Sequence, residues 1–274
     1  MVQEQTADYG NLNSDNSIFG IPYFARSFSD ALQILLSVAS EANTSKYSVF
    51  TPNVHHVYLI QKNEKFRQAY QSCSISLLDG MPLVWACKLF AKKKVHKISG
   101  SDIFVRLFKG AIKQGLRVYL LGGAPGVAEK AANILLEANG EKELVSTYSP
   151  PFGFENSMLE NQKIIDDINR FSPNLLFVAF GAPKQELWIN DNISRIGVKV
   201  AIGVGGSFDF VVGVQKRAPV FIQNLGFEWL FRLLCDPKRL WKRYLITNTF
   251  FIWLVAREAI KQMICRKATR GKCL

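Results

Sequence analysis

Asp79 is the residue of this sequence whose position suits it best to acid–base chemistry. It leaves the apolar run Ser74–Leu78 directly into a glycine turn. A carboxylate at such an edge is partly desolvated, which raises its pKa and suits it to remove a proton from a substrate hydroxyl. The alternative is a turn aspartate that caps the helix beginning near Pro82. From its position alone, the structural role is favoured.

Two glycine-rich turns follow other apolar runs. Gly122 and Gly123 join one run to a helical segment, and Gly205 and Gly206 follow another. Glycine lets the backbone approach a phosphate, and the helix that follows offers free amides. Neither turn has the GxGxxG pattern, and such turns often serve tight packing alone. Asp209, close behind the second turn, could hold a ribose or a base edge, or could be an N-cap or turn acid.

The remaining polar candidates carry no metal-ligand pattern. Gln185 follows Gly181-Ala182-Pro183, and its amide could bond a sugar hydroxyl or a uracil edge, or be an exposed helix glutamine. His55, His56 and His96 have no ligand spacing, and the sequence contains no DxD pair and no CxxC pair. If a diphosphate binds here, Arg, Lys or backbone amides must carry its charge. The sequence therefore predicts a site without metal or cofactor.

Short apolar runs alternate with amphipathic segments, which is typical of βα units around a parallel sheet. Asp30 and Ser101 are expected to be helix N-caps. Ligands of such sheets bind outside the carboxyl ends of the strands, where all of these candidate residues would meet. The expected strands are 46–51, 74–78, 117–121, 144–148, 175–179 and 199–204, and the expected helices are 30–41, 62–72, 82–89, 101–114, 126–139, 161–171 and 184–195.

The alternation stops after about Gly213, where basic helical segments begin. The sequence thus predicts a Rossmann-like α/β fold, with a mostly parallel sheet flanked by helices and a C-terminal basic helical appendage. Its expected divisions are a disordered segment over 1–17, the α/β domain over 18–213 and the appendage over 214–274. The first segment lacks the pattern of a secretory signal, so a cytoplasmic location is expected.

Nearly all of the net charge lies at the C-terminal end. Residues 215–274 carry thirteen Lys or Arg and three acids, a net charge of +10, against +2 for residues 1–214. Cations interleaved with Trp and Phe are typical of a segment that binds an anionic membrane surface. A solvated basic face and single-stranded nucleic acid binding are the alternatives. The apolar stretch 245–256 is too short to span a bilayer.

Eight strings of residues, in this order along the chain, resemble the WecG/TagA/CpsF glycosyltransferases (glycosyltransferase family 26). The resemblance runs from about Ser17 to Glu258. The strings are 51–53 (TPN), 78–80 (LDG), 99–102 (SGSD), 121–123 (LGG), 180–186 (FGAPKQE), 203–209 (GVGGSFD), 216–219 (KRAP) and 226–232 (GFEWLFR).

This resemblance implies transfer of a sugar from a UDP-sugar to an acceptor sugar linked to undecaprenyl diphosphate, in exopolysaccharide or cell-wall polymer synthesis. The reaction would invert the anomeric centre and need no metal. Asp79 would be the general base, which reverses the preference for a structural role. Arg217 and Arg232, from the appendage, would close over the site and stabilise the leaving diphosphate. Thr51, Asn53 and Gln185 match residues of the sugar pocket, and the protein would sit at the inner face of the bacterial membrane.

One position departs from the family pattern. Many members have an arginine before the Gly-Ser/Thr-Asp string, where this chain has His96-Lys97-Ile98. Lys97 can supply charge but not a bidentate fork. The resemblance leaves the donor open among N-acetylmannosamine, its uronic acid and glucose.

Two other functions fit the sequence less well than the transferase does. A nicotinamide-dependent oxidoreductase needs GxGxxG after the first strand, where this chain has Thr51-Pro52-Asn53. A basic nucleic-acid-binding protein would line a groove with its charge, whereas this charge gathers at one end with Trp and Phe. The pattern favours the transferase and predicts no nucleic acid partner.

Overall fold

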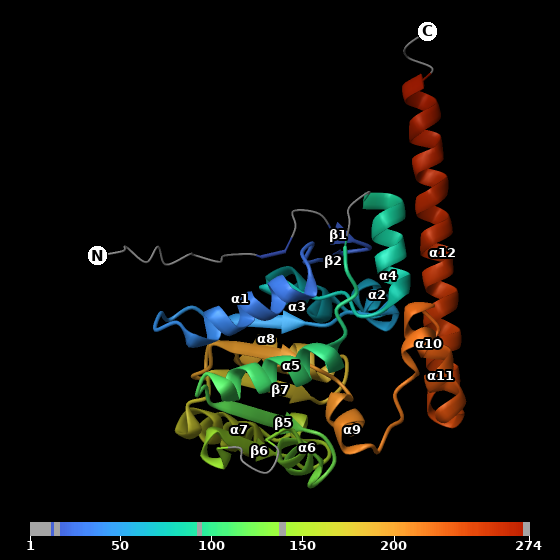
Figure 1. The fold of residues 1–274 in the computed structure, drawn as a ribbon. Helices are drawn as coiled ribbons and strands as arrows, with labels where there is room; N and C mark the ends of the chain where they lie inside the picture. The colour runs from blue at the N-terminus through green and yellow to red at the C-terminus, as the bar shows by residue number, and fades with distance from the viewer. Residues whose placement is uncertain (1–11, 14–16, 92–94, 137–140, 271–274) are drawn as a thin grey trace.

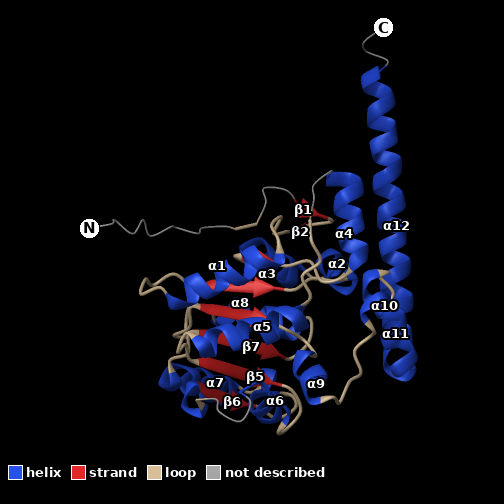
Figure 2. Ribbon diagram, viewed as in Figure 1, coloured by secondary structure: helices blue, strands red, loops and turns tan. Residues whose placement is uncertain are grey.

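The centre of the molecule is a six-stranded sheet with helices on both faces (Figure 1, Figure 2). The computed structural model describes residues 12–13, 17–91, 95–136 and 141–270. Every pairing in the sheet is parallel, in the order β4-β3-β8-β7-β5-β6. This confirms the predicted fold class, and each of the six expected runs coincides with one strand to within a few residues at its ends. The strands are β3 (Tyr47–Phe50), β4 (Ile75–Ser76), β5 (Val118–Gly122), β6 (Val145–Tyr148), β7 (Leu175–Ala179) and β8 (Val200–Gly203).

The central strands are apolar on both faces, as a sheet covered on each side requires. In β5, Val118 and Leu120 belong to one buried cluster, and Tyr119 and Leu121 belong to the other. The first cluster packs under α1 (Phe28–Ser40), α5 (Gly100–Lys113), α6 (Val127–Leu136) and α9 (Ser207–Val212), and the second under α2 (Val54–Lys62), α3 (Glu64–Ser72), α7 (Met158–Phe171) and α8 (Lys184–Asn192).

The structure corrects several of the predicted helices. The expected helix over 62–72 begins two residues later, at Glu64, as α3. Lys62 is instead the last residue of α2, because Asn63 ends that helix and its side chain caps α3 by accepting from the Phe66 amide. The helices α2 and α9 and the short antiparallel pair β1 (Ser17–Ile18) and β2 (Ile21–Pro22) were not predicted. The expected helix over 82–89 is α4 (Met81–Ala86), which continues as a π-helical turn over Cys87–Ala91. The end of the helix expected over 126–139 lies outside the described residues.

Neither predicted N-cap was correct. The N-cap of α1 is Ser27, whose hydroxyl accepts from the Asp30 amide, while the Asp30 carboxylate accepts from the Ser27 amide. Asp30 therefore completes a capping box from inside the helix. The N-cap of α5 is Ser99, and its side chain makes no capping bond. The first amides of α5 thus stay available to a carboxylate from elsewhere.

The C-terminal segment folds as three helices along one side of the sheet domain, α10 (Val220–Asn224), α11 (Glu228–Cys235) and the long α12 (Pro237–Arg270). In Figure 1, α12 stands beside α2 and α4 and projects beyond them. Its inner face is held by Tyr58 of α2, whose ring lies 5.4 Å from that of Phe250, and by the buried Phe251 and Leu254. Among the described helices, none joins enough length to enough hydrophobicity to cross a membrane.

Most of the expected N-terminal segment 1–17 lies outside the described residues. The Leu12 amide donates to the Ser74 carbonyl at 3.3 Å, and the Asn13 side chain donates to the Cys73 carbonyl at 3.1 Å. These bonds join the two residues to the chain just before β4. The predicted division into segment, domain and appendage stays a prediction.

Candidate active site

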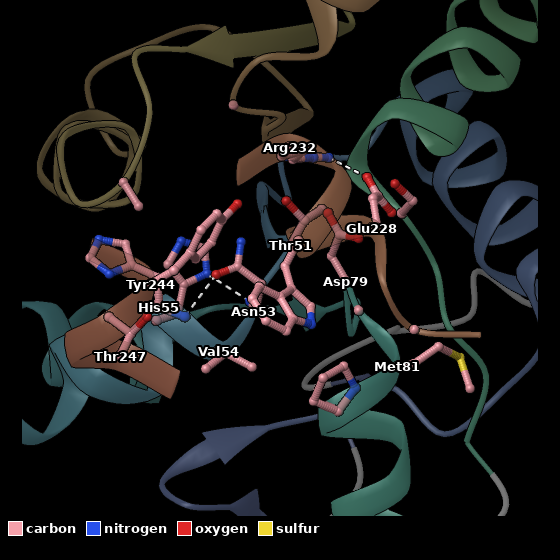
Figure 3. Close-up of a pocket in the computed structure, with 18 of the residues that line it drawn as sticks. Thr51, Asn53, Val54, His55, Asp79, Met81, Glu228, Arg232, Tyr244 and Thr247 are labelled. Carbon is pink, nitrogen blue, oxygen red and sulfur yellow. Dashed lines mark hydrogen bonds and ion pairs between the residues drawn. The ribbon is translucent and has the colours of Figure 1, made fainter. Parts of the chain in front are cut away.

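A cavity of about 550 Å³ opens at the carboxyl ends of β3, β4, β7 and β8, beneath α4 and the C-terminal helices. The structure brings together seven of the predicted site residues there: Thr51, Asn53, Asp79, Gln185, Gly205, Gly206 and Arg232. Figure 3 shows Asp79 close to Thr51, with the Arg232–Glu228 ion pair beside it. Further cations of α12, Arg239 and Arg243, also line the cavity.

Asp79 has the environment of a base whose proton affinity is raised. Its pKa is raised to about 6, first by burial and then by the Glu228 carboxylate, while Arg232, Lys97 and a hydrogen bond from the Gly100 amide oppose the increase. Gly100 is the first residue of α5, so the carboxylate faces the open amides of that helix. The cap of α4 is Gly80, with no side-chain hydrogen bond. Asp79 therefore does not cap the helix near Pro82, as the structural alternative required.

Glu228 links two cations beside Asp79. One carboxylate oxygen pairs with Arg232, and the other lies 3.4 Å from the Lys97 ammonium. Burial alone would raise the pKa of Glu228, but Arg232 and Lys97 outweigh it and hold that pKa below its usual value. The Arg232 guanidinium also lies over the Phe210 ring, 4.9 Å from its centroid. Glu228 was missed as a site residue, because Lys97 and Asp79, beside which it lies, are distant in the sequence.

Thr51 and Asn53 are held where β3 passes into α2. The Thr51 hydroxyl donates to the Gly203 carbonyl at 2.9 Å, which ties the ends of β3 and β8 together. Asn53 is the N-cap of α2, and its Oδ1 accepts from the His55 amide. Both side chains therefore have a structural bond in addition to their place in the cavity wall.

A buried polar network supports Gln185 from behind. The side chain is 2% exposed, so the alternative of an exposed helix glutamine is wrong. Its Oε1 accepts from the amides of Gly181 and Gly205, at 3.2 and 3.0 Å, and its Nε2 donates to Glu186 at 2.8 Å. Gln185 thus fixes the two turns that follow β7 and β8.

Glu186 and His56 complete this network. The Asn53 amide donates to His56 Nδ1 at 3.1 Å, so the proton of the neutral ring is on Nε2, which lies 3.7 Å from Glu186. Burial lowers the pKa of His56 to about 3 and raises that of Glu186 to about 7. A neutral imidazole therefore faces a carboxyl that holds its proton until near neutral pH. Neither residue was predicted, although His56 lies within the capping box of Asn53.

Four predicted residues lie outside the set that lines the cavity. Gly122 packs tightly, since a Cβ there would meet the Ala179 carbonyl at 2.8 Å, and the Gly123 amide donates to the same carbonyl. Asp209 lies in the first turn of α9 and accepts from Gln215.

Arg217 is the fourth of these residues. It forms two 2.7 Å bonds to Asp102, so in this arrangement its guanidinium joins the appendage to α5.

An α/β domain with a buried carboxyl group, an amide and several cations at the carboxyl edge of its sheet is suited to group transfer from an anionic substrate. Residues 16–264 match the sequence model of the glycosyl transferase WecG/TagA/CpsF family. The chain belongs to this family of glycosyltransferases. Among the described residues, no group of three or more His, Cys, Asp or Glu side chains is placed to hold a metal ion.

Two relatives carry the same descriptive name, N-acetylglucosaminyldiphosphoundecaprenol N-acetyl-beta-D-mannosaminyltransferase. The protein of Bacillus spizizenii (strain ATCC 23059 / NRRL B-14472 / W23) is 31% identical over 198 residues, which cover 72% of this chain and 74% of the relative. That of Staphylococcus aureus (strain MRSA252) is 26% identical over 244 residues, covering 89% and 93%. Family membership decides for the glycosyltransferase over the oxidoreductase.

Proposed function

We propose that this protein transfers a sugar from a UDP-sugar to an acceptor sugar carried on undecaprenyl diphosphate, with inversion and without a metal ion. The observation that carries the proposal is the raised pKa of Asp79 in a cavity that is also lined by cations, among them Lys97 and Arg232. The names of both relatives support this substrate class. Since both are named for N-acetylmannosamine, UDP-N-acetylmannosamine is the donor to test first.

In the proposed reaction, the Asp79 carboxylate takes the proton of the attacking acceptor hydroxyl. The hydroxyl oxygen forms a bond to the anomeric carbon on the face opposite the diphosphate, and the bond from that carbon to the UDP oxygen breaks. The proton ends on Asp79 and the electron pair on UDP. A carboxylate with a pKa of about 6 is ionised at neutral pH yet more basic than an ordinary aspartate, which favours this step.

The charge that develops on UDP would be stabilised by the cations of the cavity. The ion pair with Glu228 places Arg232 beside Asp79. Lys97, from the chain before α5, pairs with the other oxygen of the Glu228 carboxylate. The Lys97 ammonium thus supplies charge at the family's arginine position. Positive groups fixed before the reaction stabilise a developing anion without further reorganisation. Under this proposal, Thr51, Asn53 and Gln185 contact the sugars, and the turns at Gly205 and Gly206 offer backbone amides.

Peripheral attachment to the inner membrane face fits the outer surface of α12. Apolar side chains that recur along one face of this helix are exposed, and basic residues accompany them. Such a surface binds at the headgroup region of anionic lipid. The apolar residues are Trp241, Leu245, Trp253, Ile260 and Ile264.

The proposal is tested by transfer from radiolabelled UDP-N-acetylmannosamine, UDP-glucose or the uronic acid donor to N-acetylglucosamine linked to a prenyl diphosphate, with and without EDTA. We expect transfer that EDTA does not reduce. Asp79→Asn should lower kcat by a factor of about 10²–10⁴ while the donor still binds. The matched control is Asp166→Asn on the exposed face of α7, which should keep full activity. Absence of transfer from every donor, or full activity of Asp79→Asn, would refute the proposal.

A further inference from the structure

The side chains that α12 presents to the cavity change in character along the helix. Nearest α11 they are cationic, at Arg239 and Arg243, and then polar, at Thr247 and Asn248. The last ones, ending at Val255, are apolar. At about 1.5 Å per helical residue, this gradient extends over roughly 24 Å. A ligand lying along α12 would therefore meet charge at one end and hydrocarbon at the other.

The middle of this gradient contains polar atoms that the protein itself leaves unsatisfied. In the described part of the chain, His55 Nδ1, Arg243 Nε and Thr247 Oγ1 are buried and make no hydrogen bond. Buried polar groups without protein partners are costly, so in a cavity wall they are placed to take a partner from a ligand or from water. Figure 3 shows His55 and Thr247 together, apart from Asp79 and Glu228.

The unsatisfied cluster is suited to an anion. Burial and the nearby Arg243 lower the pKa of His55 to about 4, so its ring is neutral and has one N–H to donate. Arg243 supplies the charge, and the Thr247 hydroxyl adds a second donor. An arginine flanked by neutral donors is a typical environment for a phosphate oxygen.

The apolar end of the cavity lies between α12 and α4. Phe251 is buried at its base, while Ile252 on α12 and Trp85 and Leu89 of the opposite helix and its π-helical continuation are 67%, 47% and 59% exposed. Exposed apolar side chains on two facing elements that continue into a polar site are typical of a binding groove. Figure 1 shows α4 and α12 side by side over this part of the molecule.

We infer that this half of the cavity binds the lipid diphosphate of the acceptor, with the diphosphate at Arg243, His55 and Thr247 and the first prenyl units between Ile252 and Leu89. The continuity of one cavity from Asp79 through these cationic and polar residues to the apolar wall carries this assignment. It matches the order of sugar, diphosphate and hydrocarbon in such an acceptor. The inference rests on the proposed function, since it assigns the tail of the proposed acceptor.

Direct binding tests the groove without any transfer reaction. Affinities of farnesyl diphosphate and methyl diphosphate would be measured by calorimetry in detergent-free buffer. We expect farnesyl diphosphate to bind at least about tenfold more tightly, because several buried methylene groups contribute to its affinity. Ile252→Gln and Leu89→Gln should each remove most of that advantage and leave methyl diphosphate unchanged. Arg243→Gln should weaken both ligands.

Leu245→Gln is the matched control, since Leu245 is an exposed apolar residue of α12 that does not line the cavity. It should leave both affinities unchanged. Equal binding of the two diphosphates, or an equal loss in Leu245→Gln and Ile252→Gln, would overturn the inference, the latter in favour of a general lipid-binding face. If the protein bound farnesyl diphosphate more tightly than methyl diphosphate but transferred no sugar, the proposed function would be refuted and the assignment of the groove to a prenyl diphosphate would stand.

Discussion

The Lys97 ammonium lies 3.4 Å from the Glu228 carboxylate and so joins the chain before α5 to the first turn of α11. This contact places the appendage over Asp79, whose carboxylate both groups influence in opposite directions. Glu228 raises the pKa of Asp79 and Lys97 lowers it. The same ion pair therefore positions the C-terminal helices and adjusts the proposed base.

The pH dependence of transfer should follow this balance. With a pKa of about 6, Asp79 is protonated and inactive as a base below that pH, so kcat/KM should increase about tenfold per pH unit up to pH 6 and then level off. Lys97→Gln removes a cation that lowers the pKa of Asp79, so the rising, acidic part of the pH profile should move to higher pH. Glu228→Gln removes the neighbouring anion and should move it to lower pH. Shifts in the same direction, or a profile without an acidic limb, would contradict the assignment of Asp79.

Arg217 should act by holding the appendage to α5. Arg217→Ala and Asp102→Ala should reduce transfer to a similar extent, and the double variant should lose little more, because each single change breaks the same pair of 2.7 Å bonds. Since both side chains are about a third or more exposed, their coupling in the free energy of unfolding should not exceed about 1 kcal/mol. Arg217→Lys should restore only part of the activity, because an ammonium cannot form the bidentate fork. Additive losses, with Arg217→Ala far more damaging, would instead indicate direct contact with substrate.

The central strands were predictable because their side chains are apolar on both faces, and the strand ends then followed from the geometry of parallel sheets. The helix α2 was missed because its sequence, VHHVYLIQK, is rich in β-branched and aromatic residues, and its signal is the capping asparagine Asn53. The helix α9 has the same strand-like composition, in FDFVV. In both helices, tertiary packing outweighs local propensity.

The lining of the cavity was predictable where a residue enters it directly from the end of its own strand, as Asp79 and Thr51 do. The site was missed where a contact joins distant parts of the chain, as with Glu228 and Lys97 or with His56 and Glu186. No local pattern encodes such pairs. The sequence could not distinguish Arg243 from the other cations of residues 215–274, because its place in the cavity depends on how α12 packs against α2.

Glu186 should make the stability of the protein depend on pH near neutrality. Its folded pKa of about 7 lies above the ordinary value of 4.5, so its contribution is fully present below 4.5 and is lost as the pH rises through 7. Glu186→Gln has no such proton to lose. Its melting temperature should exceed that of the wild type by several degrees at pH 8 and by much less at pH 5.

His56, Tyr70 and Gln185 face position 186 in the wild type and in Glu186→Gln. The titration of groups that the two proteins share therefore cancels in the difference between their melting temperatures. Glu129→Gln, on the exposed surface of α6, is the control and should follow the wild type at both pH values. Parallel curves for Glu186→Gln and the wild type would show that the buried carboxyl does not lose its proton in this range.

The exposed face of α12 should determine membrane binding separately from catalysis. Ile260→Asp and Ile264→Asp place charge on neighbouring turns of one helix face, beyond the residues that line the cavity. Partitioning to vesicles that contain phosphatidylglycerol should fall by at least about tenfold in the double variant, because both apolar burial and attraction to anionic lipid are weakened. Transfer to a water-soluble acceptor should stay at the wild-type rate.

Met158→Asp, which changes an exposed apolar residue of α7, is the control for this face and should leave vesicle binding intact. Added salt should weaken the binding of the wild type, since the cations of α12 contribute through screened attraction. If the double variant bound vesicles as tightly as the wild type, another surface of the protein would have to bind the membrane. If it lost soluble transfer as well, α12 could not be divided into a face for the cavity and a face for the lipid. Only loss of vesicle binding with soluble transfer retained agrees with a helix whose inner face completes the active site while its outer face holds the enzyme where the acceptor resides.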